Sequence, residues 1–426
     1  MIRSVRLLAA FLTFHVSIAV CGDLPDATPE ELGLSSKRVQ TIADYVDSLV
    51  TTGDVPGAVA IVTYQGKVIL HKASGLAERD PRNEMKLDTV FRIASMTKPI
   101  TSVAVMILVD EGKVKLDDPV TKFIPSFAPQ VLAFNGPRPA REEIKIKHLL
   151  SHTSGLAYNN APSIGELYTR ENIQSGVCRS TTTLDQNIQR LARIPLLFDP
   201  GEQFNYGMST DVLGLVVEKA SGKSLGEFFD EKIFKPLGMS DTSFRVPMDK
   251  RQRLAGTFVA EDNGLRQLGP SEQITQAVFN VVMSPDYPIA EDHRYISGGG
   301  GLCGTTMDYA RFCQMILGNG SCDGVQILRP ETVNLMTTNQ IGSLESSVAG
   351  DLEYKFGLGF SVFPSGPVLR NEVGWGGVWG TVFRISRGGN WAAVLLTQRI
   401  FDESYIRREI EFTRTVREAI QEKLAD

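Results

Sequence analysis

Ser95 and Lys98 are the residues whose types and spacing point most directly to chemistry. They form the only Ser-x-x-Lys in the chain, just before the apolar run Val103 to Leu108 that predicts a buried helix. Residues three apart lie on one face of a helix, so the Lys98 amine can reach the Ser95 hydroxyl. A helix N-terminus supplies N–H groups and partial positive charge that suit an oxyanion. The pair predicts a serine nucleophile with a lysine partner.

A second serine motif, Gly222-Lys-Ser-Leu-Gly226, has the Gly-x-Ser-x-Gly form. A nucleophile in that motif must follow a strand. Ser224 instead follows the helical run Val212 to Ala220 and a Ser-Gly stop. The sequence therefore predicts that Ser224 lies in a turn between two helices.

Histidine is not expected to be the base. Of five histidines, His15 lies in a leader-like segment and none stands in a recognisable triad context. A serine hydroxyl still needs a group to take its proton. A lysine and a tyrosine that share a proton could do what histidine does in a Ser-His-Asp triad.

Three further segments could bring partners to Ser95. The segment 146–156 predicts a helix closed by Gly155, and the segment 200–209 delivers Tyr206 in a loop before another helix. Gly374-Trp-Gly-Gly-Val-Trp-Gly380 puts glycine-rich backbone on a strand, where a ligand can approach closely.

The elements that must position these groups suggest an α/β (α+β) fold. Residues 57–71 read as a β-hairpin turning at 65–67, and strand-like runs return only at 354–363, 378–386 and 391–397. An amphipathic helix is expected at about 406–423. We expect one antiparallel sheet built from both ends of the chain, flanked by helices, with a helical domain inserted between.

This arrangement gives domain boundaries. Residues 22–110 and 300–426 would form the α/β domain, and 111–299 a mostly helical domain. Clefts between domains often bind ligands, so we expect the active site at the interface.

Composition favours a globular protein that acts on a small molecule. The 426 residues are 42% hydrophobic and 22% charged, which allows a large core. Net charge is −5 and no cluster of lysine and arginine stands free of acids, so nucleic acid is not an expected partner. No pattern predicts a metal or another cofactor.

The N-terminus predicts export. Residues 1–21 resemble a signal peptide, with two arginines before an apolar stretch and cleavage expected near Gly22, so the protein would be secreted or periplasmic. Val20 is a poor neighbour for a lipid-modified cysteine, so lipid anchoring at Cys21 is not expected, nor is a stable membrane span. The remaining cysteines read chiefly as small buried thiols, although Cys313 and Cys322 are close enough along the chain for a disulfide.

Five segments together resemble the serine β-lactamase-like hydrolases, which include class C β-lactamases, DD-peptidases and family VIII carboxylesterases. In chain order they are Ser95-Met-Thr-Lys98, Leu116-Asp-Asp-Pro-Val120, His148-Leu-Leu-Ser-His-Thr-Ser-Gly-Leu156, Pro200-Gly with Tyr206, and Trp375-Gly-Gly377. The resemblance covers nearly all of the chain after the leader and implies the β-lactamase/DD-peptidase fold.

The resemblance also implies roles. Ser95 would be the nucleophile, Lys98 would take or relay its proton, and Tyr206 would be the general base and acid. Trp375, Gly376 and Gly377 would bind substrate, where β-lactamases have Lys-Thr-Gly. The backbone N–H groups of Ser95 and Val378 would form the oxyanion hole.

Two departures from the β-lactamase pattern favour an esterase. Trp375 and Gly376 replace the lysine and threonine that would bind a β-lactam carboxylate, and Met208 replaces the amide of a Tyr-x-Asn. The sequence therefore predicts a carboxylesterase for short-chain, apolar acyl groups on small esters, with weak cephalosporin hydrolysis. A β-lactamase, a DD-peptidase or D-aminopeptidase, an acyltransferase and a non-catalytic peptide-binding protein remain alternatives. The natural substrate and the oligomeric state do not follow from the sequence.

Overall fold

Both ends of the chain build one antiparallel sheet. The computed structural model describes residues 20–128, 130–133, 136–346, 354–364 and 371–421. Eight strands run in the order β14-β15-β16-β17-β18-β1-β2-β3. They come from both ends of the chain, as the sequence predicts. Their bounds are β1 (Gly57–Tyr64), β2 (Lys67–Glu78), β3 (Asn83–Glu84), β14 (Lys355–Phe356), β15 (Ser361–Val362), β16 (Glu372–Gly377), β17 (Thr381–Ser386) and β18 (Trp391–Leu396).

The β1–β2 hairpin shows how local chemistry sets the register. Gln65 and Gly66 have φ of 51° and 78°, the two positive values that a two-residue type I′ turn needs. Beyond the turn, β1 pairs with β2 on one side and with β18 on the other, which joins the N-terminal hairpin to the C-terminal strands.

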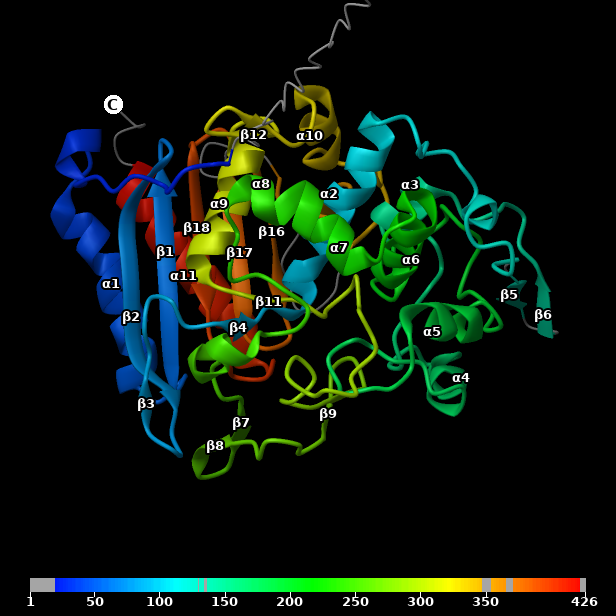
Figure 1. Cartoon of the computed structure of the whole chain (residues 1–426), viewed down its shortest axis with the longest axis horizontal. Coiled ribbons are helices and arrows are strands. Elements are labelled where there is room, and N and C mark those ends of the chain that lie inside the picture. Colours follow the sequence, from blue (N-terminus) through cyan, green and yellow to red (C-terminus); the bar gives the residue numbers. More distant parts are fainter. Residues whose placement is uncertain (1–19, 129, 134–135, 347–353, 365–370, 422–426) are drawn as a thin grey trace, which may run out of the picture.

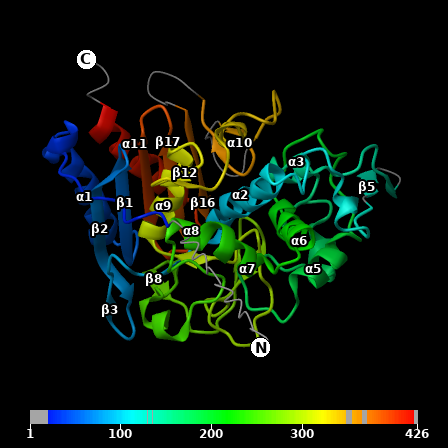
Figure 2. The ribbon, with the colours of Figure 1, turned by 45° about the horizontal axis from the view of Figure 1, so that its top comes forward.

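Helices cover both faces of the sheet, and the alternation of β1 explains how. Ala58, Ala60 and Val62 point to the face covered by α1 (Ser36–Thr51) and α11 (Ser404–Gln421). Val59 and Ile61 belong to the large core on the other face, where α9 (Thr306–Leu317) packs. In Figures 1 and 2, α9 lies in front of the sheet and α11 behind it, and α1 is seen at the left of the sheet. Every residue of β1 is therefore buried.

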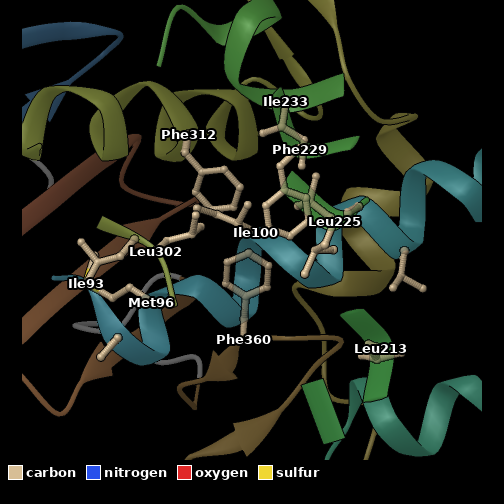
Figure 3. Packing of buried hydrophobic residues seen from close by; sticks show 14 of the residues in the cluster. Ile93, Met96, Ile100, Leu213, Leu225, Phe229, Ile233, Leu302, Phe312 and Phe360 are labelled. Atoms are coloured by element: carbon tan, nitrogen blue, oxygen red, sulfur yellow. The ribbon is translucent and has the colours of Figure 1, made fainter. Parts of the chain in front are cut away.

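Helix α2 (Thr97–Asp110) runs through the middle of the molecule. Its residues from Thr97 to Leu108 are all buried, as expected for a helix that is apolar on most sides. Ile100 packs among Phe312 of α9 and Leu225 and Phe229 of the inserted segment (Figure 3). The helix thus ties the sheet to the inserted segment.

The inserted segment, residues 111–299, lies beside the sheet (Figures 1 and 2). It combines short helices with three two-stranded hairpins, joined by irregular chain. The helices are α3 (Ile146–Leu150), α4 (Gly165–Arg170), α5 (Leu184–Leu191), α6 (Ser209–Ser221), α7 (Leu225–Phe229) and α8 (Lys235–Leu237). The hairpin strands are β5 (Gln130–Ala133), β6 (Gly136–Pro139), β7 (Phe258–Glu261), β8 (Gly264–Gln267), β9 (Ile274–Gln276) and β10 (Val281–Met283).

Short elements complete the fold between these parts. One pair of strands links the segment before Ser95 to the chain after the insertion. After α9 the chain forms a short hairpin and then a helix. They are β4 (Phe91–Arg92) with β11 (Cys303–Gly304), β12 (Ser321–Cys322) with β13 (Val325–Gln326), and α10 (Pro330–Met336). The domain boundaries given above stay a prediction.

The cysteines differ from expectation at one point. Cys178, Cys303 and Cys313 are free and buried, as predicted. Cys322 is bonded to Cys21, so the possible Cys313–Cys322 bridge is wrong. Residues 1–19 of the expected leader lie outside the described residues. Cleavage at Gly22 would remove Cys21 and leave Cys322 unpaired, whereas cleavage before Cys21 would keep the bridge.

In the part of the chain that the structure describes, no helix has both the length and the apolar character needed to cross a membrane.

Candidate active site

Ser95 stands on a tight turn that leads into α2. A 3₁₀ turn over Ala94–Met96 precedes the helix, and Ser95 itself is only partly buried while its neighbours are buried. Ala94 has a φ of 43°, in the left-handed region that alanine seldom adopts. The turn therefore presents the hydroxyl to a pocket at the N-terminal end of α2, where the sequence predicts it.

Lys98 lies one turn further on and is 2% exposed. Its Nζ donates to Ser95 Oγ at 3.1 Å, to the Tyr158 hydroxyl at 3.0 Å and to the Gly299 carbonyl at 2.7 Å. Nζ therefore has three oxygen partners, which hold the nitrogen in one place. The i, i+3 spacing brings the two side chains together as predicted.

Tyr206 reaches Ser95 from the other side. Its hydroxyl donates to Ser95 Oγ at 2.7 Å, and Lys98 Nζ lies 4.7 Å from the centre of its ring. The loop that carries it packs so closely on the segment after α3 that a side chain on Gly207 would lie 2.6 Å from the Ala157 backbone. Ser95 and Lys98 therefore form one hydrogen-bonded cluster with Tyr206, which lies far from them in the sequence.

Tyr158 is a member of this cluster that the sequence analysis did not name. It is buried, it accepts the Lys98 hydrogen bond, and its ring packs edge-on against Tyr206. Burial and the neighbouring Tyr206 raise the pKa of Tyr158 well above its usual value, so the phenol stays protonated at neutral pH. The sequence offered one signal for Tyr158: it stands two residues after Leu156, at the end of the segment 146–156 that was expected to approach Ser95.

The end of β16 lies against the turn that holds Ser95. A side chain on Gly377 would collide with the Ile93 carbonyl, and Thr381 Oγ1 donates to that same carbonyl at 3.2 Å. A side chain on Gly376 would collide with the Tyr405 hydroxyl. The threonine of a Lys-Thr-Gly strand therefore has no room at position 376.

Trp375 forms an aromatic wall beside the cluster. Its ring centre lies 5.1 Å from that of Tyr206, and its Nε1 is 3.4 Å from the Tyr206 hydroxyl. Phe356 and Tyr354 pack edge-on against the indole, with ring centres 5.2 and 6.1 Å from that of Trp375. The indole is thus fixed on several sides.

These groups line one small pocket of ≈ 100 Å³. Ser95, Tyr206 and Tyr158 meet there with Trp375 and Val378. The other lining side chains are mainly apolar or aromatic, including Val177, Phe279, Val281, Phe363, Phe401 and Tyr405. The nucleophile candidate therefore faces an apolar space of limited size.

His152 is the histidine that packs against this cluster. Its ring lies 4.9 Å from that of Tyr206, and its Nδ1 has no hydrogen-bond partner among the described residues. Burial and the charge of Lys98 lower the pKa of His152 well below its usual value, so the ring is neutral. Its contacts are those of a packing residue.

Ser224 has a structural role. It is the N-cap of α7, where its side chain accepts from the Glu227 N–H and the Glu227 carboxylate accepts from the Ser224 N–H in return. The expectation of a turn between two helices is confirmed.

The comparison with known proteins follows the geometry. Residues 42–412 match the family described as Beta-lactamase. This chain belongs to the β-lactamase family. It is 33% identical over 352 residues to Esterase EstB of Burkholderia gladioli, covering 81% of this chain and 86% of EstB. It is 31% identical over 332 residues to Acyltransferase calJ of Penicillium decumbens, covering 74% of this chain and 72% of calJ.

A solved structure agrees with this assignment. EstCE1, described as a hydrolase with promiscuous acyltransferase activity, has a TM-score of 0.77 and 29% identity, and the match covers 90% of this chain and 98% of EstCE1. The protein is therefore a serine hydrolase of the β-lactamase fold, and the family resemblance and the fold class inferred from sequence are confirmed.

Proposed function

We propose that this protein is a carboxylesterase that cleaves small neutral esters with short, apolar acyl groups through a covalent acyl-enzyme on Ser95. One observation carries the proposal: Ser95 Oγ lies within hydrogen-bond distance of both Lys98 Nζ and the Tyr206 hydroxyl, and opens on an apolar pocket. The similarity to EstB supports ester hydrolysis.

Acylation begins at Ser95. The Lys98–Tyr206 pair reacts in the form that lacks one proton, and it takes the hydroxyl proton as Ser95 Oγ attacks the ester carbonyl. The backbone N–H groups of Ser95 and Val378 stabilise the oxyanion, a role supported by the packing of the β16 end on the Ser95 turn. Tyr206 then donates a proton to the leaving alcohol.

Deacylation repeats these steps with water. The same Lys98–Tyr206 pair takes a proton from the water that attacks the acyl-enzyme, and Ser95 leaves with a proton restored. Tyr158 holds Lys98 in place through both halves of the reaction, because its hydroxyl takes one of the three hydrogen bonds of the amine.

Trp375, Gly376 and Gly377 set the substrate class. An indole offers one N–H donor and a broad apolar face, where a lysine could bind a carboxylate. A penicillin carboxylate brought against this wall would lose hydration without compensation. The narrow pocket favours short acyl groups, and a strained cephalosporin would be cleaved weakly.

The test compares substrates. For the purified protein, kcat/KM for p-nitrophenyl acetate should exceed that for p-nitrophenyl decanoate and for benzylpenicillin, with slow turnover of a chromogenic cephalosporin. A higher kcat/KM for benzylpenicillin would replace the esterase proposal with a β-lactamase. Absence of any reaction with a fluorophosphonate probe would favour a non-catalytic binding protein.

Acyl transfer is a second candidate, because calJ is an acyltransferase and EstCE1 is described as having promiscuous acyltransferase activity. An alcohol would then replace water in deacylation. Incubation of p-nitrophenyl acetate with excess hexanol separates the two: hexyl acetate as the main product supports transfer, and acetate supports hydrolysis.

We also propose export to an oxidising compartment, supported by the leader-like residues 1–21 and the Cys21–Cys322 bond. N-terminal sequencing of the protein from a secreting host should find a start at or shortly before Cys21, because a start at Gly22 would leave Cys322 without its partner. An intact Met1 in that fraction would contradict export by cleavage.

A further inference from the structure

A buried carboxyl group lies behind Lys98 and has no part in the mechanism above. Asp211 is on α6, five residues beyond Tyr206, and its exposed fraction is 0%. Oδ1 accepts hydrogen bonds from the Tyr295 hydroxyl at 2.7 Å and from Ser297 Oγ at 2.6 Å. Oδ2 has no hydrogen-bond partner among the described residues. A buried carboxylate with one free oxygen is costly unless an opposite charge lies close.

Gly299 separates Asp211 from Lys98. A side chain at position 299 would collide with Asp211 Oδ2, and its Cβ would lie 3.6 Å from Lys98 Nζ. Only glycine therefore fits between the carboxylate of Asp211 and the amine of Lys98 at this position. Gly299 is one of four consecutive glycines in the sequence. The contact with Asp211 explains why this position has no side chain.

Hydrogen bonds also join the two side chains through this glycine. Ser297 Oγ donates to Asp211 and accepts from the Gly299 N–H at 3.1 Å. The Gly299 carbonyl in turn accepts from Lys98 Nζ at 2.7 Å. The carboxylate therefore holds the turn whose carbonyl fixes the amine.

The charges point the same way. Burial raises the pKa of Asp211, while the Ser297 hydrogen bond, the charge of Lys98 and the Tyr295 hydrogen bond oppose that rise. Lys98 also lies close to Tyr158, Tyr206 and His152, none of which is a carboxylic acid. Asp211 is thus the acid that can balance an ammonium at Lys98.

We propose that Asp211 is a positioning residue for the reaction at Ser95: it fixes Lys98 through Ser297 and Gly299, and it stabilises the protonated amine that forms when Ser95 attacks. The inference rests on the proposed function, because it assigns Lys98 the proton. Asp211 touches no reacting atom and acts through Lys98.

Asp211→Asn tests the charge with little change of shape. Its side-chain oxygen can still accept from Tyr295 and Ser297. For p-nitrophenyl acetate we expect kcat to fall about tenfold to a hundredfold while KM stays within about threefold. Without the carboxylate the ammonium at Lys98 has no counter-charge, so the pH dependence of kcat should differ from that of the wild type. Unchanged kcat and pH profile in a folded variant would overturn the proposal.

Two variants that keep the charge complete the test. Ser297→Ala cuts the link to Gly299, so kcat should fall about threefold to tenfold while the pH profile stays in place. Tyr295→Phe removes a hydrogen bond to Asp211 outside that link and should keep kcat within about twofold. If Asp211→Asn does not fold, a Ser297→Ala variant with the wild-type kcat overturns the proposal.

Failure of this inference differs from failure of the proposed function. Wild-type protein that leaves Ser95 unlabelled by a fluorophosphonate removes the esterase, and with it the role of Asp211. Labelled wild type with an equally active Asp211→Asn variant removes the role of Asp211 alone.

Discussion

Ser95 faces two surfaces that are built in opposite ways. On one side Lys98, Tyr158 and Tyr206 form a polar cluster in which hydrogen bonds join Lys98 to Ser95 and Tyr158, and Tyr206 to Ser95. On the other side Trp375 stands in a group of aromatic rings and offers a single N–H. The polar side can transfer protons, whereas the aromatic side can only favour one substrate over another. Changes on the first should therefore alter kcat, and changes on the second should alter which substrate is used.

Lys98→Ala should produce the largest change. It removes all three hydrogen bonds of the amine and the group that takes the Ser95 proton. We expect kcat for p-nitrophenyl acetate to fall about ten-thousandfold, the upper end for a general acid–base group, with KM little changed. Thermal denaturation of the variant serves as the folding control. A variant with a raised KM and an unchanged kcat would show that Lys98 binds substrate and does not transfer the proton.

Tyr206→Phe should come next. The ring and its packing on Trp375 remain, but the hydroxyl that reaches Ser95 is lost, so kcat should fall about a hundredfold or more. The matched control is Tyr158→Phe, which removes the other hydroxyl of the cluster without touching Ser95 and should cost less. Near-normal kcat in Tyr206→Phe would place the base elsewhere.

Trp375→Lys tests the aromatic side. A lysine there could pair with a carboxylate, so the ratio of kcat/KM for p-nitrophenyl acetate to that for benzylpenicillin should fall about tenfold. Trp375→Phe keeps the apolar wall and should leave the ratio close to that of the wild type. A ratio that moves equally in both variants would show that Trp375 acts through packing.

His152→Asn should have the smallest effect. The ring packs on Tyr206 yet stays neutral, because burial and the charge of Lys98 lower its pKa. Asparagine tolerates the φ of 55° found here. We expect kcat within about tenfold of the wild type and the same pH profile between pH 5 and 8. A hundredfold loss would make His152 part of the polar cluster.

The two sides also differ in how far they could be predicted. The Ser95–Lys98 contact follows from helical spacing alone, and the β1–β2 hairpin from Gln65-Gly66. The approach of Tyr206 to Ser95 came from the family resemblance, since 111 residues separate the two. Tyr158 was missed because its position depends on how irregular chain in the inserted segment packs. Asp211 lies on α6 and was missed because its partners, Tyr295 and Ser297, come from irregular chain.

Local details were missed for similar reasons. The helix expected to close at Gly155 ends at Leu150, because Ser151 Oγ bonds back to the Lys147 carbonyl and His152 takes a positive φ. The run 354–363 forms two short strands, β14 and β15, which pair with each other. The Cys21–Cys322 bond joins residues 301 positions apart, which no spacing rule predicts.

The most direct test of the account is the site of the covalent intermediate. The wild-type protein is treated with a fluorophosphonate, digested and analysed by mass spectrometry, with Ser95→Ala and Ser224→Ala treated in parallel. We predict one adduct on the peptide that contains Ser95, the same adduct in Ser224→Ala and none in Ser95→Ala. An adduct that persists in Ser95→Ala would contradict the account.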